Sequence, residues 1–328
     1  MSIVLRHAFV AMFSAAILVG LATASADEFP SKPIRLVVPA PPGGGTDTLS
    51  RLVATALTET AKWTVVTDNI PGAGGNIGFD ATFRAPKDGH TLAMGEPSNM
   101  IVNPFMYKRI PFDVERDMQP VTLVARIPLV LIVAATSPHA SARDLIEAAR
   151  KKPLSYASSG NGTLAHVQGE LWKTKTGVDI LHVPYKGAAP ALMDVIGGQV
   201  DFCFTSIPVA MPMIQAGRVR ALAIASRERL PILKDVPTME EAGFPGMEAS
   251  AIFGIIAASG IPAAALARLS TEINRILVKP SVEERLVAMG AERVPGSFGG
   301  DPASFQKLLR EERAKWGPVV KASGAVVD

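Results

Sequence analysis

The feature that most constrains this chain is a glycine-rich loop between an apolar run and an amphipathic run. Residues 34–38 are apolar except for one arginine, and residues 39–47 read Pro-Ala-Pro-Pro-Gly-Gly-Gly-Thr-Asp. Residues 49–57 then place their apolar side chains at helical spacing. This order predicts a strand, a glycine loop and a helix, with Thr46 or Asp47 as the capping residue.

The same local arrangement returns well over a hundred residues later. Residues 154–158 predict a strand, residues 159–163 (Ser-Gly-Asn-Gly-Thr) a second glycine loop, and residues 164–171 the start of another amphipathic helix. The two stretches are not sequence repeats. Other short apolar runs alternate with helical patterns along the chain, which is typical of an α/β protein with parallel strands.

Each glycine loop predicts a binding site for an anion. Glycines leave backbone N–H groups uncovered, and the start of a helix carries partial positive charge and unpaired N–H donors. Neither loop contains Arg or Lys, so we expect backbone N–H groups and Ser or Thr hydroxyls to hold a small carboxylate. Hydrogen bonds to charged groups contribute roughly 1.5–3 kcal/mol each, and micromolar affinity needs about 8 kcal/mol. Roughly four or five such bonds would therefore suffice.

The N-terminus predicts export. A short basic start precedes an apolar run at residues 8–22, and residues 24–26 form an A-x-A site, so we expect residues 1–26 to be a signal peptide that is cleaved after Ala26. The single cysteine, Cys203, lies in an apolar run and is expected to be buried. A formal net charge of +3 over 328 residues gives no electrostatic footprint for nucleic acid.

Length and the placing of apolar strands predict two domains. A chain of 328 residues suits two domains, and we expect the first crossover just before the apolar strand at residues 128–135. The proline-rich stretch at residues 230–246 is expected to lie at the return crossover. Domain 1 would then be 27–128 plus 229–328, and domain 2 would be 129–228.

Motifs for other chemistries are missing. The stretch at residues 72–78 has Ile77 where a dinucleotide-binding loop needs its third glycine, so we interpret it as a packing turn outside the site. The chain has no G-x-x-x-x-G-K-[ST] phosphate loop, no G-x-S-x-G elbow and no close-spaced His, Cys or acidic pattern for zinc. We therefore expect no catalytic residue, no metal and no cofactor.

An ordered set of motifs resembles a known family. Each motif alone is weak, but together they span nearly the whole chain after residue 26: PPGGGTD at 41–47, PGAGGNIG at 71–78, PKDG at 86–89, SSGNG at 158–162, HVPYKG at 182–187 and GGQVD at 197–201. With this set the chain resembles the periplasmic solute-binding proteins of tripartite tricarboxylate transporters, of the Bordetella-uptake-gene (Bug) type.

The resemblance implies an α/β, two-domain periplasmic binding protein fold (type II, Venus-flytrap) with two interdomain crossovers. It implies a periplasmic monomer that captures a small carboxylate, either a di- or tricarboxylate or an aromatic acid, in the interdomain cleft. The partners would be the membrane components of a tripartite tricarboxylate transporter. The candidate ligand-binding residues are Pro42, Gly43, Gly44, Gly45, Thr46, Asp47, Ser98, Asn99, Ser158, Ser159, Gly160, Asn161, Gly162, Thr163, His166, Lys186, Gly187 and Thr205.

One candidate departs from the pattern of the family. Members often carry Asp after the strand at residues 200–204, where this chain has Thr205. Losing that carboxylate removes a partner for a ligand amine and a repulsive neighbour for a ligand carboxylate, so an amino acid is the less expected ligand. His166 and Lys186 also have plain structural interpretations, as a satisfied helix histidine and a solvated lysine.

Two other functions stay open at this point. One is a secreted α/β enzyme that acts on a small carboxylate, because the members of a catalytic triad need not be close in sequence. The other is a periplasmic ligand sensor for a two-component system.

Overall fold

A computed structural model describes residues 29–292 and 298–323 of the chain. The expected signal peptide, residues 1–26, lies outside the described residues. One mixed sheet runs through the described part of the molecule, with the strand order β2-β1-β3-β9-β4-β7-β5-β6 and with β8 paired to β4. Its strands are β1 (Ile34–Val38), β2 (Val65–Asn69), β3 (Thr91–Gly95), β4 (Met118–Ala134), β5 (Leu154–Ser158), β6 (Ile180–Pro184), β7 (Phe202–Ser206), β8 (Val219–Ile224) and β9 (Ser250–Ala258).

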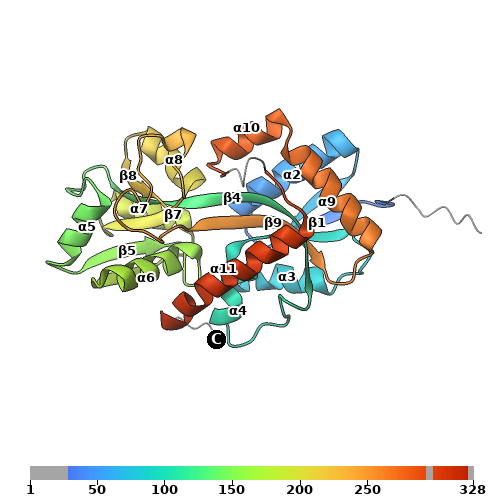
Figure 1. Ribbon diagram of the computed structural model, residues 1–328, viewed down its shortest axis with the longest axis horizontal. Helices are drawn as coiled ribbons and strands as arrows, with labels where there is room; N and C mark the ends of the chain where they lie inside the picture. The colour runs from blue at the N-terminus through green and yellow to red at the C-terminus, as the bar shows by residue number, and fades with distance from the viewer. Residues whose placement is uncertain (1–28, 293–297, 324–328) are drawn as a thin grey trace, which may run out of the picture.

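Helices cover both faces of this sheet in each lobe (Figure 1). The longer ones are α2 (Gly45–Ala61), α3 (Asn76–Phe83), α5 (Ala142–Ala149), α6 (Leu164–Thr176), α7 (Ala188–Ile196), α8 (Ile207–Gln215), α9 (Ala263–Leu277), α10 (Pro280–Ala288) and α11 (Pro302–Ala322). Short turns are η1 (Ala73–Gly75), the π-helical η2 (Ser98–Val102), α4 (Asn103–Met106) and η3 (Pro231–Leu233). No helix in this part of the chain is long and apolar enough to cross a membrane.

Two lobes are joined by β4 and β9, which pass between them side by side (Figure 1). In the first lobe β1 pairs with β2 and β3 in parallel, and in the second β5 pairs with β6 and β7 in parallel, as the sequence predicts. The pairs that involve β4 and β9 are antiparallel, so the all-parallel expectation is wrong for them. The reason is topological, because one strand carries the chain out of the first lobe and the other brings it back.

Strand β4 is longer than the sequence predicts. The expected apolar strand began at residue 128, but the observed strand begins at Met118 and continues for 17 residues. It includes Pro120 and Pro128. Proline cannot donate to a ladder, and the pairing with β9 shifts register just after Pro120, where the missing N–H is accommodated.

The segment between β8 and β9 packs against the second lobe. Met239 donates its backbone N–H to the carbonyl of Ile224 (2.8 Å), and Gln168 of α6 donates its side-chain amide to the carbonyl of Met247 (2.7 Å). The ring of Phe244 lies 5.4 Å, centroid to centroid, from that of Trp172. We therefore propose that the return to the first lobe lies at the start of β9, later than the expected boundary at residue 229.

Helix α11 lies along one side of the molecule and reaches from the first lobe towards the second (Figure 1). Near its start the ring of Phe305 lies against Gly254 of β9. In its middle Arg313 donates to the carbonyl of Met100 (3.0 Å), and Lys315 donates to the carbonyl of Glu248 (2.6 Å). This helix therefore fastens the hinge strands to η2 and to the segment before β9.

Candidate functional site

The first glycine loop joins β1 to α2 and is exposed from Pro42 to Gly44. Its backbone is open to approach: a Cβ added at Gly43 or Gly45 would meet nothing within 4 Å, and one at Gly44 only the carbonyl oxygen of Pro41, at 3.8 Å. Gly43 has φ +84°, a conformation that favours glycine. The helix is capped by Gly44 without a side-chain hydrogen bond, so the expectation that Thr46 or Asp47 caps it is wrong.

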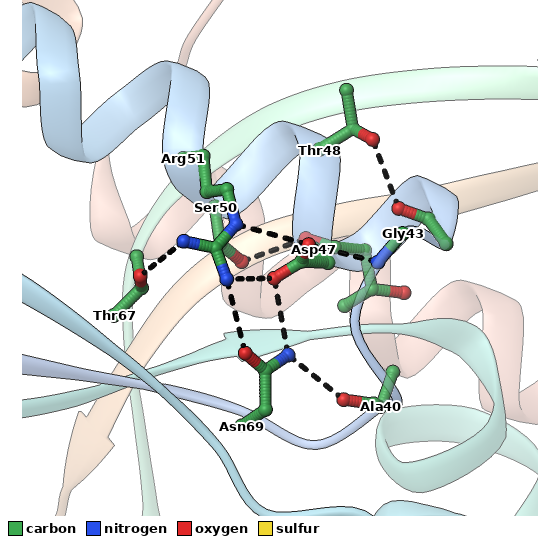
Figure 2. A network of polar contacts seen from close by, with 10 residues as sticks. Ala40, Gly43, Asp47, Thr48, Ser50, Arg51, Thr67 and Asn69 are labelled. Atoms are coloured by element: carbon green, nitrogen blue, oxygen red, sulfur yellow. Dashed lines mark hydrogen bonds and ion pairs between the residues drawn. The ribbon is translucent and has the colours of Figure 1, made fainter.

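Asp47 instead holds the loop from behind (Figure 2). Its carboxylate accepts hydrogen bonds from the backbone N–H of Gly43, from Arg51 Nε and from Asn69 Nδ2, each at 3.0 Å. Asn69 Nδ2 also donates to the carbonyl of Ala40 at 3.0 Å. The Arg51 guanidinium and these N–H donors lower the pKa of Asp47 to about 2. The carboxylate is therefore ionised at neutral pH, and its negative charge is balanced by Arg51.

Backbone N–H groups at the start of α2 remain open. The first N–H of α2 with a backbone partner is that of Thr48, which donates to the carbonyl of Gly44 (2.9 Å). Among the described residues no hydrogen bond from the N–H of Gly44, Gly45 or Thr46 is present. A helix start whose N–H donors are unpaired and not covered by side chains can bind an anion.

The third expected segment, Ser98 and Asn99, starts η2 beside the first loop. Asn99 is fully buried, and its Oδ1 accepts the backbone N–H of Glu96 (3.1 Å), while its Nδ2 has no hydrogen-bond partner among the described residues. Glu96 itself is a residue that sequence reasoning missed. Its Oε2 accepts a hydrogen bond from the Thr46 hydroxyl, which ties the end of β3 to the start of α2.

The second glycine loop joins β5 to α6, and its side chains bond among themselves. Ser158 is 1% exposed, and its Oγ lies 2.7 Å from Nε2 of His182. Thr163 caps α6 by accepting the N–H of His166 (3.4 Å), and its hydroxyl donates to the carbonyl of Gly160 (2.8 Å). The hydroxyls of Ser158 and Thr163 therefore already have protein partners.

His166 has a structural place in this loop. Its Nδ1 accepts the N–H of Gly162 (3.2 Å), and its ring stacks on His182 with centroids 4.2 Å apart. Burial lowers the pKa of both rings, that of His182 to about 3 with help from His166, so both imidazoles are neutral at physiological pH. Asn161 is exposed, and with His166 and Glu170 it borders a cavity of about 700 Å³ that also reaches Pro153.

The remaining candidates lie on neighbouring strand ends of the second lobe. Gly187 caps α7 and donates its N–H to the carbonyl of Ser159 (3.2 Å), so the two loops are bonded together. Lys186 is exposed, whereas Thr205 is 6% exposed and pairs with Val130 within the sheet. The structure thus brings together most second-lobe candidates, with Lys186 at their rim.

The two lobes touch next to these loops. A Cβ added at Gly162 would lie 2.3 Å from Sδ of Met106, which ends the short helix α4 of the first lobe. Near the hinge, Gly290 lies against Ile207 at the start of α8. A larger residue at either position would have to displace the side chain of Met106 or of Ile207. Neither Met106 nor Ile207 carries a sequence signal for such a role.

The second glycine-rich stretch of the first lobe is a packing device, as its sequence pattern predicts. A Cβ at Gly75 would lie 2.6 Å from Asn99 Nδ2, and one at Gly78 would lie 2.9 Å from the carbonyl oxygen of Ile70. Its glycines let α3 approach β1 and η2 closely.

This arrangement, with two lobes, two crossover strands and glycine loops at helix starts, defines a two-domain Venus-flytrap binding protein. A family model described as "Tripartite tricarboxylate transporter family receptor" matches residues 49–325. The chain belongs to this family of periplasmic receptors, and within it to the Bug type.

Three relatives place the chain more closely. Protein BugT of Bordetella pertussis (strain Tohama I) is 36% identical over 307 residues, which is 93% of each chain. The structure "R. palustris Rpa4515 with adipate" is similar with a TM-score of 0.83 and 37% identity, over 90% of this chain and 99% of that one. The structure of MatC (Rpa3494) from Rhodopseudomonas palustris with bound malate is similar with a TM-score of 0.78 and 31% sequence identity. The match covers 89% of this chain and 100% of that one.

Proposed function

We propose that this protein captures a small carboxylate between its two lobes and delivers it to the membrane components of a tripartite tricarboxylate transporter. One carboxylate group of the ligand would lie at the first glycine loop. The second glycine loop, at residues 158–163, would close over it from the other lobe. Export by the signal peptide would place the protein, as a monomer, in the periplasm.

The observation that carries the proposal is the set of open N–H groups at Gly44, Gly45 and Thr46. Three hydrogen bonds to a carboxylate would contribute roughly 5–9 kcal/mol before ordering costs, and the partial charge of the helix start adds up to about 2 kcal/mol when partly buried. Micromolar binding needs about 8 kcal/mol, so the first loop supplies much of the affinity and lobe closure the rest.

A dicarboxylate is the ligand that we favour. Two similar proteins are described with adipate and with malate, which both carry two carboxylates. The first lobe offers open N–H groups and no free cation at its loop, since Arg51 is paired with Asp47. Such a site recognises a carboxylate by shape, and the far end of the cleft would select the length of the ligand.

We further propose that the chain is not an enzyme, although it contains one pair that resembles catalytic machinery. The hydroxyl of Ser158 and the ring of His182 are 2.7 Å apart, as a nucleophile and its base would be. Ser158 is 1% exposed, and among the described residues no carboxylate hydrogen-bonds to His182. A buried serine hydroxyl beside a histidine that no carboxylate orients fits a structural hydrogen bond that holds the loop better than a catalytic pair.

The proposal is tested by thermal denaturation and calorimetry of the mature chain with adipate, malate and benzoate. A ligand at a hundredfold excess over its Kd stabilises the protein by about 2.7 kcal/mol, so at least one acid should raise Tm clearly. NMR of the ligand after long incubation should show no new product. Stabilisation only by amino acids, sugars or nucleotides would overturn carboxylate capture, and turnover of a bound acid would overturn the non-enzymatic role.

A further inference from the structure

The end of β3 places a second carboxyl group next to the first glycine loop. Glu96 follows the strand directly, and its Oε2 accepts the hydroxyl of Thr46, the second residue of α2. Its backbone N–H donates to Asn99 Oδ1 (3.1 Å), so both the backbone and the side chain of Glu96 are hydrogen-bonded. Glu96 is half-buried, and among the described residues no hydrogen bond to its Oε1 is present, so this oxygen is open to another partner.

The two carboxyl groups beside this loop have opposite environments. Asp47 is surrounded by Arg51, Asn69 and the N–H of Gly43, and its pKa falls to about 2. Burial raises the pKa of Glu96, and the hydroxyl of Thr46 offsets this only in part. On α2, Asp47 and Arg51 are paired with each other, and no charged side chain among the described residues is a cause of the pKa shift of Glu96. Two neighbouring carboxyl groups whose pKa values are shifted in opposite directions can take different roles.

We propose that Glu96 is a specificity-determining residue that binds the ligand's carboxylate as a neutral acid, donating a hydrogen bond from Oε1. The inference rests on the proposed function, since it concerns a carboxylate at the first loop. Whenever Glu96 is ionised in the free protein, binding takes up one proton from solvent onto Glu96, and no covalent bond forms or breaks. The ligand carboxylate accepts this O–H in addition to the backbone N–H groups of the loop.

The physical reason is repulsion between like charges. Two carboxylates cannot share one site in their ionised forms, so an arriving carboxylate raises the pKa of Glu96 further. Between the pKa of Glu96 in the free protein and that in the complex, the apparent Kd rises tenfold for each pH unit. An amide at residue 96 donates a similar hydrogen bond at every pH and carries no proton to exchange.

The test is isothermal titration calorimetry of adipate and malate with the full mature chain, from about pH 6.5 to about pH 8.5, where the carboxyl groups of both acids are ionised. Buffers of different ionisation enthalpy report the protons taken up. We expect the wild-type chain to take up as much as one proton, with affinity that falls towards tenfold per pH unit. Glu96→Gln should exchange no proton, bind with a flat pH profile and exceed the wild-type affinity at the highest pH. Glu59→Gln, which removes an exposed carboxylate from the far end of α2, should behave like wild type.

Each other result has a definite meaning. Binding by the wild-type chain without proton uptake at a pH where Glu96 is ionised in the free protein, or a pH-dependent affinity that is unchanged in Glu96→Gln, overturns the role of Glu96 and leaves carboxylate capture standing. Tighter binding of aspartate than of malate that disappears in Glu96→Gln would mean that an ionised Glu96 accepts from an ammonium group, which also overturns the inference. If neither acid binds to the wild-type chain, carboxylate capture itself fails and the role of Glu96 falls with it. The wild-type measurement decides the matter even if the variant does not fold.

Discussion

The sharpest test of the first glycine loop is the substitution Gly44→Val. Gly44 has φ −81° and ψ 174°, an extended conformation that valine adopts readily. Its added Cβ would meet only the carbonyl oxygen of Pro41, at 3.8 Å, so the folded chain has room for it. The side chain would project over the open N–H groups, where the ligand's carboxylate is proposed to lie.

The expected loss of affinity is much larger than the expected loss of stability. Blocking two hydrogen bonds to a carboxylate removes at least about 3 kcal/mol, and each 1.4 kcal/mol is about tenfold in Kd, so adipate should bind more than about a hundredfold more weakly. Valine is a poorer capping residue than glycine, which costs about 1 kcal/mol or less. Calorimetric titration with adipate and a thermal scan of the free protein measure the two effects separately.

Two further glycine variants serve as controls. Gly300→Val adds the same side chain where a Cβ would meet only Leu123 Cβ at 3.9 Å, away from both loops, and should bind adipate like wild type. Gly43→Ala forces φ +84° on alanine and should lower stability by about 1–2 kcal/mol even without ligand. Undiminished adipate binding by Gly44→Val would remove the loop from the site and refute the reasoning.

Three further outcomes are expected. Asp47→Asn should lower the free energy of unfolding by about 1–2 kcal/mol near neutral pH. Because the folded pKa of Asp47 is depressed to about 2, this difference should shrink as pH falls from about 4 towards 2; a difference independent of pH in denaturation curves would contradict it. Gly162→Ala should weaken adipate binding by crowding Met106, and Met106→Ala should recover part of the loss with a coupling of about 1 kcal/mol, whereas additive effects in the double-mutant cycle would disprove the contact. Cys203, with 1% exposure and a pKa raised by burial to about 12, should react with a thiol reagent only on unfolding, and rapid labelling of the native chain would show that its strand opens.

The strand, loop and helix units were predictable because their signals are local. The helix expected around residues 49–57 is observed as Gly45–Ala61, and the one expected to start at residue 164 is observed as Leu164–Thr176. Both have a glycine or capping signal at the start and apolar residues at helical spacing. Strand order and the direction of β4 and β9 are set by pairing between distant segments, which composition does not encode.

The hydrogen-bond partners within the site were not predictable from the spacing of residues in the sequence. Asp47 stands where a capping residue is expected, but Asn69 approaches it from β2, 22 residues further along the chain. The hydrogen bond from Asn69 helps to orient the Asp47 carboxylate towards the loop. Glu96 meets Thr46 across 50 residues of sequence, and its environment is set by burial. Local patterns located both loops but did not say which of their groups are already occupied.

The boundary of the second lobe shows the same limit. Residues 230–246 are rich in proline and resemble a linker, yet Met239 and Phe244 pack onto β8 and α6. Irregular backbone alone therefore does not mark a crossover. The observed connection is instead made by strands, because hydrogen-bonded pairing of β4 with β9 satisfies the backbone between the lobes.

This pairing has a consequence for how such receptors diversify. A shared ladder, paired from Met118 opposite Ala258 to Pro128 opposite Ser250 with two shifts of register, passes between the lobes. Recombination that exchanged one lobe for that of a relative would have to cut inside both strands and restore their register and bulges. We therefore expect ligand preference to evolve by point substitutions at strand ends, at positions such as Glu96 and Thr205, with both lobes inherited as one unit.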